Sequence, residues 1–236
     1  MNQTIELNDL FDYGYKIYQN PLYFKFSVDS VLLAEFIKIK KNDNKIIDLC
    51  TGNAPIPMIL SKKYGNKLEI TGVELQKEIY DLGIKSINYN KITNIKLIND
   101  DINNLSFINK YDIVSCNPPY FKNNIIQNEN KIKAIARHEI KIDLKSIIRI
   151  SSKLLNNGGY FYLVHRPERL TDIIILLDKY HFGIKRIVPI YTYKDNKCVF
   201  ILIESIYNGK NYVKIDKPVF LKHDDKTYQG IFEGKN

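Results

Sequence analysis

Short apolar strand patterns alternate with helical patterns through most of this chain, and this alternation constrains the fold more than any other feature. Buried strands are predicted at residues 45–49, 67–73, 95–98, 112–116 and 160–164. Amphipathic helices are predicted between and after them, at residues 78–89, 143–155 and 168–180. Two further strand patterns, residues 187–193 and 198–204, predict a hairpin. An α/β fold follows, with a mostly parallel sheet, one antiparallel edge strand and helices on both faces.

We expect one domain, because neither an internal repeat nor a composition break divides the 236 residues. Residues 1–44 are expected to form an N-terminal cap segment, residues 45–204 the catalytic core and residues 205–236 an irregular, Lys-rich tail. Within the cap, residues 17–20 are typical of an edge strand. Residues 24–33 are typical of a loop that enters a helix, and this turn either covers the core or closes over a cofactor.

Polar residues stand at the ends of four successive predicted strands, namely Asp48, Glu74, Asp101 and Asn117. The carboxyl ends of parallel strands meet at one edge of a sheet, where open α/β folds bind their ligands. After Asp48, a tight turn with Gly52 leads into a helix that begins with proline, so backbone amides would face a ligand. An acidic residue about 20 positions later often binds a ribose diol, which indicates Glu74. Asp101 could accept a hydrogen bond from the amino group of a cofactor adenine.

The segment Asn117-Pro118-Pro119-Tyr120 follows the fourth of these strands. Two successive prolines hold the backbone extended, which places an amide side chain, the Pro118 carbonyl and an aromatic face together. The two oxygens could each accept one hydrogen of adenine N6 while Tyr120 stacks on the ring, which is catalysis by positioning without a strong base. The alternative is a structural loop, in which Asn117 caps a turn and Tyr120 fills a gap in the core. The neighbouring strand ends favour the functional interpretation.

The long polar segment at residues 121–139 follows this motif and is either a functional lid or a surface loop. Arg137 and His138 lie in it, where they could meet a phosphate or stack on a base.

Charge and composition limit the classes of partner. The net charge of +9 favours a polyanionic partner, although heavy use of Lys, Asn and Ile throughout could also explain part of it. The three cysteines and four histidines show no metal-ligand spacing, so no metal is expected. The N-terminus lacks an apolar signal-peptide core, and no apolar run reaches membrane-spanning length, so we expect a cytoplasmic protein.

Six motifs together resemble those of a known family. They are F-S-V-D-S-V-L-L-A (residues 26–34), D-L-C-T-G-N-A-P-I-P (48–57), G-V-E-L-Q (72–76), C-N-P-P-Y-F-K (116–122), A-R-H-E (136–139) and V-H-R-P-E-R-L (164–170). The set is similar to that of the bacterial tRNA1(Val) adenine-37 N6-methyltransferases, which are class I S-adenosylmethionine-dependent enzymes. The resemblance extends from about residue 18 to the hairpin. N-P-P-Y alone is shared with several other N-methyltransferases, and the A-R-H-E and H-R-P-E-R-L motifs narrow the family.

The resemblance implies a seven-stranded, Rossmann-like methyltransferase fold, S-adenosylmethionine as cofactor and the anticodon loop of a tRNA as partner. A flipped-out adenine would receive the methyl group by direct in-line transfer. The base would be held by Asn117, Pro118, Pro119 and Tyr120. The cofactor would contact Asp48, Cys50, Thr51, Gly52, Asn53, Ala54, Glu74, Leu75, Asp101, Ile102 and Asn117. The RNA would contact Phe121, Lys122, Arg137, His138, His165 and Arg166. Ala54 departs from the usual glycine, which is expected to narrow the space above the methionine part of the cofactor.

Three alternatives remain open from the sequence. Protein-glutamine N5-methyltransferases also use N-P-P-Y on a planar amide, but they usually carry a helical domain before the cofactor strand, and only about 44 residues precede Lys45 here. Methylation of rRNA or DNA instead of tRNA is the second alternative, which the motifs do not exclude. A basic RNA-binding module with an inactive core is the third alternative, and the intact series of polar strand ends argues against it.

Overall fold

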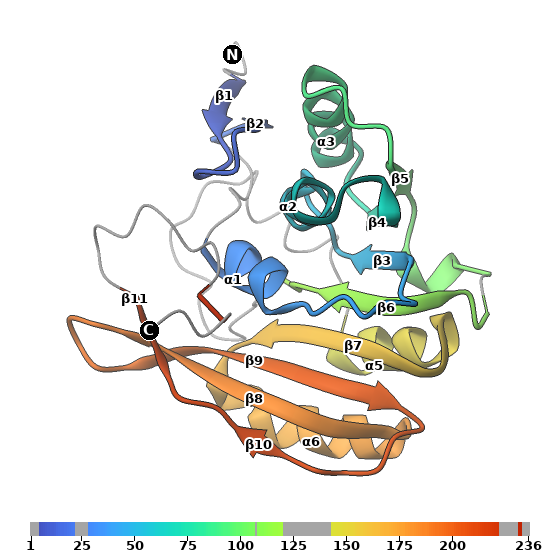
Figure 1. The fold of residues 1–236 in the computed structure, drawn as a ribbon, viewed down its shortest axis with the longest axis vertical. Coiled ribbons are helices and arrows are strands. Elements are labelled where there is room, and N and C mark those ends of the chain that lie inside the picture. The colour runs from blue at the N-terminus through green and yellow to red at the C-terminus, as the bar shows by residue number, and fades with distance from the viewer. Residues whose placement is uncertain (1–4, 22–27, 107, 120–142, 222–230, 233–236) are drawn as a thin grey trace.

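A large, mostly parallel sheet forms the centre of the computed structural model (Figure 1). Its strand order is β10-β8-β9-β7-β6-β3-β4-β5, and β11 also pairs with β8. In chain order these strands are β3 (Lys45–Leu49), β4 (Glu69–Glu74), β5 (Ile95–Asn99), β6 (Tyr111–Cys116), β7 (Leu155–His165), β8 (Phe182–Thr192), β9 (Cys198–Tyr207), β10 (Lys214–Ile215) and β11 (Val219–Leu221). The structure describes residues 5–21, 28–106, 108–119, 143–221 and 231–232.

The strand directions confirm the predicted α/β class. Strands β7, β6, β3, β4 and β5 run parallel to one another, and β9 runs antiparallel to both β7 and β8. The reversed strand belongs to the predicted hairpin and lies in the antiparallel edge region, one position in from β8. Strands β8, β9, β7, β6, β3, β4 and β5 make up the predicted seven-stranded core, and β10 and β11 extend it.

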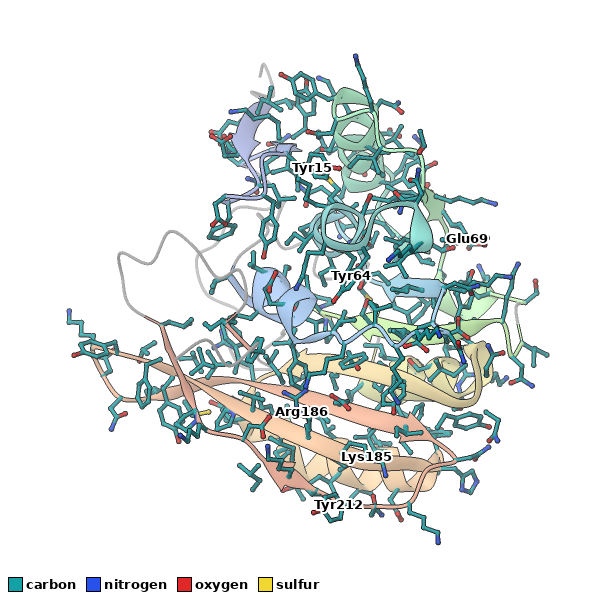
Figure 2. The ribbon with its side chains drawn as sticks, viewed as in Figure 1. Tyr15, Tyr64, Glu69, Lys185, Arg186 and Tyr212 are labelled. Atoms are coloured by element: carbon teal, nitrogen blue, oxygen red, sulfur yellow. The ribbon has the colours of Figure 1, made fainter. Side chains whose placement is uncertain are left out.

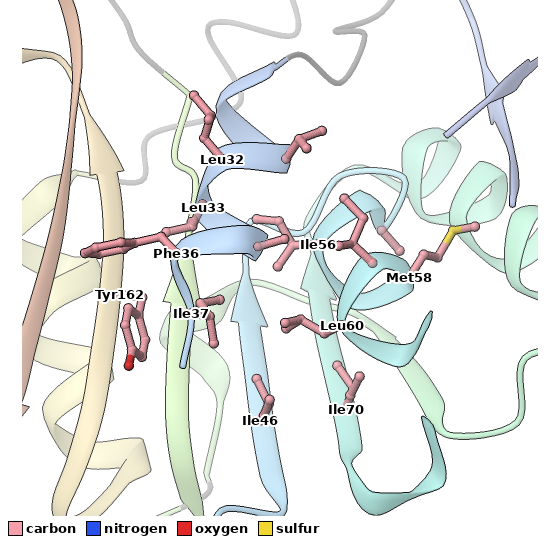
Figure 3. Packing of buried hydrophobic residues seen from close by; sticks show 14 of the residues in the cluster. Leu32, Leu33, Phe36, Ile37, Ile46, Ile56, Met58, Leu60, Ile70 and Tyr162 are labelled. Atoms are coloured by element: carbon pink, nitrogen blue, oxygen red, sulfur yellow. The ribbon is translucent and has the colours of Figure 1, made fainter. Parts of the chain in front are cut away.

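Helices cover both faces of the sheet because the parallel strands alternate their buried side chains. Ile46 belongs to an apolar cluster with α1, α2 and α3, whereas Ile47 belongs to a second cluster with α5 and α6. Successive strand residues point to opposite faces, so a strand buried on both sides is apolar at nearly every position. Figure 3 shows Leu33 and Phe36 above Ile46 in the first cluster. The helices are α1 (Val28–Phe36), α2 (Pro55–Tyr64), α3 (Lys77–Tyr89), α5 (Leu144–Leu154) and α6 (Leu170–Lys179), with short 3-10 helices η1 (Gly65–Lys67), η2 (Ile102–Asn104) and η3 (Pro167–Arg169).

The N-terminal segment forms a separate antiparallel hairpin of β1 (Glu6–Asp9) and β2 (Lys16–Gln19), which confirms the strand predicted at residues 17–20. It packs on α3, where the Tyr18 backbone N–H donates to Ser86 Oγ at 2.9 Å. The Tyr15 ring, labelled in Figure 2, lies 4.8 Å from Lys62 Nζ of α2. These contacts hold the hairpin against the two helices on the first face of the sheet.

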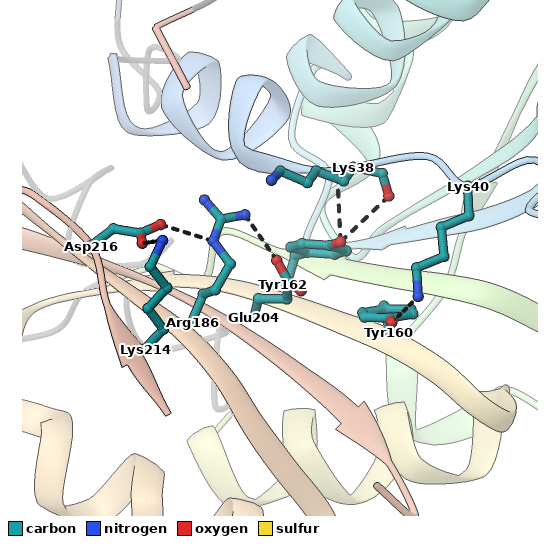
Figure 4. A network of polar contacts seen from close by, with 8 residues as sticks. All are labelled: Lys38, Lys40, Tyr160, Tyr162, Arg186, Glu204, Lys214 and Asp216. Carbon is teal, nitrogen blue, oxygen red and sulfur yellow. Dashed lines mark hydrogen bonds and ion pairs between the residues drawn. The ribbon is translucent and has the colours of Figure 1, made fainter. Parts of the chain in front are cut away.

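The C-terminal segment is more regular than the sequence predicted. Strands β10 and β11 pair in parallel with β8, and the Arg186 guanidinium anchors the segment beside them (Figure 4). Arg186 Nε donates to Asp216 Oδ2 at 2.9 Å, and its Nη1 donates to Glu204 Oε2 at 3.1 Å. The guanidinium carbon also lies 4.6 Å from the centre of the Phe36 ring. The expectation of an irregular tail is therefore wrong for residues 205–207, 214–215 and 219–221, which lie in β9, β10 and β11. A sheet edge offers unpaired backbone groups that a sequence pattern does not reveal.

Candidate active site

The four polar strand ends lie side by side in the structure. Strands β6, β3, β4 and β5 are adjacent and parallel, so their carboxyl ends meet at one edge of the sheet. Asp48, Glu74 and Asn117 lie at the ends of β3, β4 and β6, and Asp101 lies two residues after β5. The sheet order therefore brings together residues that are up to 69 positions apart in the sequence.

Asp48 is a buried residue that connects the loop after β3 with β6. Its side chain is fully buried, and its two oxygens accept hydrogen bonds from Thr51 Oγ1 and Ser115 Oγ, each at 2.6 Å. The register pairs Asp48 directly with Ser115 of β6. Burial raises the pKa of Asp48 to about 7, while the two hydroxyl donors oppose this shift. This geometry favours a carboxyl group that shapes the following loop over one that touches a ligand.

The loop after β3 has a compact backbone with three positive φ angles, at Cys50 (57°), Gly52 (61°) and Ala54 (70°). Thr51 N donates to Val73 O at 2.9 Å, which ties the loop to β4. Positive φ is unfavourable for residues other than glycine, so Cys50 and Ala54 carry backbone strain of the kind that clusters at functional sites. The loop leads directly into the N-terminus of α2, where backbone N–H groups favour an anionic or polar ligand.

Ala54 differs from its expected role. Its methyl group is fully buried and belongs to the apolar cluster with α1 and α2, so it does not line accessible space. The expectation that this methyl group narrows the space above a ligand is therefore not supported. The left-handed backbone at this residue is the feature that a glycine would ease.

Glu74 joins the loop to the start of α3. One carboxylate oxygen accepts the Gly52 N–H at 2.9 Å, and the other accepts the Gln76 N–H at 2.9 Å. Burial raises the pKa of Glu74, and these backbone donors oppose the shift. Each carboxylate oxygen has a second lone pair, so the group can still accept hydroxyl donors from a ligand. Asn99, which the sequence analysis missed, donates to the carbonyls of Glu74 and Leu75 at 2.9 Å each and aligns this strand end.

Asp101 acts as a helix cap. Its Oδ1 accepts the Asn103 N–H at 2.8 Å at the start of η2, and Ile102 is buried below it. Asp101 itself is half-buried and lies beside the end of β5. An ionised carboxylate can accept several hydrogen bonds, so capping and ligand binding are compatible here.

Asn53 contacts the N-terminal hairpin. Its Nδ2 donates to Tyr18 O at 2.8 Å, and the side chain is 5% exposed. The loop after β3 is thereby connected to β2 as well as to β4. The sequence placed Asn53 among the cofactor contacts, and the structure places it between the loop and the cap.

Asn117 leaves the sheet directly after β6. Its Nδ2 donates to Ser30 Oγ of α1 at 2.9 Å, and the side chain is half-buried. Pro118 is buried and Pro119 is half-buried. Tyr120, Phe121, Lys122, Arg137 and His138 lie outside the described residues. The sequence analysis assigned no role to Ser30, which follows Asp29 in the first turn of α1.

His165 and Arg166 end β7, next to β6 in the sheet. His165 is 7% exposed, and its pKa is lowered to about 4, first by burial and then by the charge of Arg169. Its Nδ1 accepts the Arg166 N–H at 2.8 Å, so the ring is neutral at pH 7. Arg166 is exposed and its guanidinium carbon lies 4.9 Å from the centre of the Phe200 ring. Of the two, Arg166 has the geometry to meet a phosphate.

Cys50 and Cys116 meet below the site. Burial raises the pKa of the Cys116 thiol, and the adjacent Cys50 thiol raises it further. A neutral, buried thiol such as that of Cys116 behaves as a small apolar group and lacks the features of a nucleophile.

A cavity of about 350 Å³ lies at the opposite end of the strands. Lys45, Glu69 and Tyr111, each the first residue of its strand, are among its lining residues. Amino ends of parallel strands are not where such sheets usually bind ligands, so we assign the chemistry to the polar carboxyl ends.

In residues 5–21, 28–106, 108–119, 143–221 and 231–232, no three His, Cys, Asp or Glu side chains gather in a way that could hold a metal ion. Over the same part of the chain, no helix has the length and apolar character needed to cross a membrane.

Comparison with known proteins supplies independent information. The family described as the methyltransferase small domain matches residues 23–180, which is more than half of the chain. A tRNA1(Val) (adenine(37)-N6)-methyltransferase from Pseudoalteromonas translucida is 29% identical over 150 residues, which cover 64% of this chain and 63% of that protein. A release factor glutamine methyltransferase from Francisella tularensis is 29% identical over 159 residues, which cover 64% of this chain and 56% of that protein.

Solved structures show the same fold. A predicted O-methyltransferase from Agrobacterium tumefaciens superimposes with a TM-score of 0.66 at 19% identity, covering 87% of this chain and 93% of that one. TYW2 from M. jannaschii in complex with AdoMet superimposes with a TM-score of 0.58 at 13% identity, covering 87% and 86%. At these identities the comparison supports the fold only.

Proposed function

This chain belongs to the methyltransferase small domain family, and on that premise we propose that it methylates N6 of an adenine in tRNA with S-adenosylmethionine as the methyl donor. The observation that carries the proposal is the convergence of Asp48, Glu74, Asp101 and Asn117 at four adjacent strand ends. Adenine 37 of tRNA1(Val) is the substrate we favour. The relative from Pseudoalteromonas carries that activity in its name, and the match covers 63% of its length.

The residues present fit the proposed cofactor. The Glu74 carboxylate has lone pairs for the two ribose hydroxyls, and the Asp101 carboxylate has further lone pairs that could accept from an adenine amino group. The loop around Gly52 presents backbone at the N-terminus of α2 to the methionine part. When bound, S-adenosylmethionine supplies a methyl group on a positively charged sulfur. Asp48 keeps this loop in shape through Thr51 and does not need to touch the ligand.

Asn117 and Pro118 supply the acceptors that an amino group requires. Adenine N6 carries two hydrogens, and its lone pair is delocalised into the ring. The Asn117 side-chain oxygen and the Pro118 carbonyl would each accept one hydrogen, which favours a more tetrahedral nitrogen with its lone pair directed at the methyl group. This is transition-state stabilisation by fixed dipoles. The base must leave its stack to enter the site, and this costs less in a single-stranded loop than in a duplex.

A protein-glutamine methyltransferase is the second candidate, because a glutamine side-chain amide presents the same planar NH₂ group to the same acceptors. The relative from Francisella tularensis supports it at equal identity, although the match covers 56% of that protein. The net charge of +9 supports RNA, since counterion release favours binding of a basic protein to a polyanion. Adenine in rRNA or DNA would satisfy the same geometry.

A substrate panel separates these candidates. The chain is incubated with methyl-labelled S-adenosylmethionine and, in parallel, unmodified valine tRNA, the same tRNA with guanosine at position 37, rRNA, adenine-containing DNA and a release factor. We expect label in valine tRNA as N6-methyladenosine and none in the guanosine-37 control. Label confined to rRNA, DNA or the release factor would overturn the tRNA assignment.

A further inference from the structure

Ser30 holds the side chain on which the proposed reaction depends. Its hydroxyl oxygen accepts a hydrogen bond from Asn117 Nδ2 at 2.9 Å, across a sequence separation of 87 residues. Ser30 is 5% exposed and lies in the first turn of α1, where its backbone N–H donates to Asp29 Oδ1 at 2.8 Å. The hydroxyl is thus presented to Asn117 from a fixed position on a buried helix.

The alternation of β6 explains why these two residues meet. Ile113 belongs to the apolar cluster beneath α1, and Val114 belongs to the cluster on the other face. Residues at spacing two share a face, so Ser115 and Asn117 point to the same side as Ile113. Ser115 binds Asp48 on this side, and Asn117 reaches α1. The contact follows from the sheet and is not an accident of one side-chain conformation.

The contact with Ser30 matters chemically because the two ends of the Asn117 side-chain amide differ. An NH₂ end is a donor and an oxygen end is an acceptor. Adenine N6 offers hydrogens, so only the oxygen end of Asn117 can hold it, and a rotated amide would bring two donors together. A hydroxyl that accepts from Nδ2 directs Oδ1 to the opposite side. We propose that Ser30 is a positioning residue, which orients the Asn117 amide with its oxygen toward the amino group of the substrate. This inference rests on the proposed function.

The first test is kinetic. Ser30→Ala should lower kcat for methyl transfer by about tenfold, the effect of losing one neutral hydrogen bond in the transition state. The KM for S-adenosylmethionine should change by less than about twofold, because the Ser30 hydroxyl contacts the amide proposed to hold the base. Ser30→Thr retains the hydroxyl and should restore most of kcat. Ser151→Ala is the matched control, since Ser151 is also a buried helix serine and its hydroxyl donates within its own helix, to Ile147 O at 2.8 Å.

The kinetic effect must also depend on Asn117. In the Asn117→Ala background, adding Ser30→Ala should cost no further activity, because the group that Ser30 orients is gone. Unchanged kcat in Ser30→Ala, or a full additional loss in the double variant, would overturn the proposal.

A second readout does not require activity. In the full-length ¹⁵N-labelled protein, the two Nδ2 protons of Asn117 should exchange with water about tenfold faster in Ser30→Ala than in the parent, and Ser30→Thr should return the slow rate. Unchanged exchange would show that Ser30 does not hold the amide. If the parent chain methylates no RNA, the proposed function fails, and this exchange rate still decides the role of Ser30.

Discussion

The Asp48 carboxyl group binds its proton more tightly in the folded protein than an exposed aspartate would. Its pKa of about 7 lies above the ordinary value of 3.8 because burial penalises the charged form. The folded state therefore binds the proton more tightly than the unfolded chain. The stability that this group contributes is complete below about pH 4 and is lost as the pH rises toward 7. His165 acts in the opposite sense, because its lowered pKa of about 4 removes stability as the pH falls below 6.5.

We expect Asp48→Asn to flatten the pH dependence of stability. Each unit of pKa shift corresponds to about 1.4 kcal/mol, so the parent should lose up to a few kcal/mol relative to the variant between pH 4.5 and 7.5. Urea unfolding followed by circular dichroism measures the free energy of each at several pH values. The difference between the two proteins cancels the contribution of His165. Parallel curves would contradict the assignment of a raised pKa to Asp48.

Glu74→Gln tests the ribose contact. One oxygen becomes an NH₂ group that cannot accept a backbone N–H or a ribose hydroxyl, so we expect the Kd for S-adenosylhomocysteine to rise by roughly 10- to 100-fold, the value of one or two charge-assisted hydrogen bonds. Calorimetric titration measures this. Glu69→Gln is the control, because Glu69 is exposed at the amino end of the same strand. Equal Kd values for the parent and Glu74→Gln would remove Glu74 from the cofactor site.

The polar residues at the strand ends could be predicted from the sequence, because a strand and the residue that follows it are local features. The residues that form hydrogen bonds with them could not be predicted. Ser30, Ser115 and Asn99 complete the site through contacts across different elements, and no local pattern indicates which hydroxyl meets which amide. The period-two alternation of side chains along β6 is the sequence pattern that indicates that Ser115 and Asn117 share one face of the sheet.

At the scale of elements, most bounds were predicted within two residues, and the largest errors are at the starts of two strands. Residues 78–89 and 143–155 correspond to α3 and α5 within one residue at each end. Strands β7 and β8 each begin five residues before the prediction, at Leu155 and Phe182. Helix ends carry caps such as Asp143, whereas strand ends depend on the neighbouring strand, which the sequence does not specify.

Gly72 of β4 leaves room for the loop after β3 and for Leu97 of β5. A Cβ atom there would lie 2.9 Å from Thr51 Cγ2 and 2.6 Å from Leu97 Cδ2. Gly72→Ala should therefore displace the loop after β3, lowering the free energy of unfolding by about 1–3 kcal/mol and weakening cofactor binding. Thermal unfolding and calorimetry measure the two effects. Thr51→Ser removes the clashing methyl group and should recover part of the loss. Normal stability and affinity in Gly72→Ala would show that the packing is looser than described.

At the scale of the whole molecule, the net charge of +9 and the position of the site indicate how the proposed RNA substrate would approach. Arg166 is exposed at the carboxyl end of β7, on the same edge as Asn117. Lys96 is exposed near the amino end of β5, among the residues lining the opposite cavity. If the carboxyl edge faces the RNA, these two cations should differ in their effect on binding.

We expect Arg166→Ala to weaken tRNA binding and to reduce the slope of log K against log salt by about 1, because one phosphate contact is lost. Lys96→Ala is the control on the opposite edge and should leave the slope unchanged. Fluorescence anisotropy with labelled tRNA between 50 and 200 mM salt, the range over which about 10³-fold changes are common, measures both. Equal slopes for the parent and Arg166→Ala would assign Arg166 to its contacts with Phe200 and Val199 instead.

The most direct test of the account is single-turnover methyl transfer to valine tRNA by Asn117→Ala, measured together with its affinity for the cofactor. We predict a rate at least about 10²-fold below the parent, with the Kd for S-adenosylhomocysteine within about threefold, because we propose that Asn117 holds the base amino group in the transition state. Asn157→Ala, an exposed asparagine at the other end of the sheet, should behave like the parent. A near-normal rate in Asn117→Ala would contradict the account, since no other described side chain is assigned to hold N6.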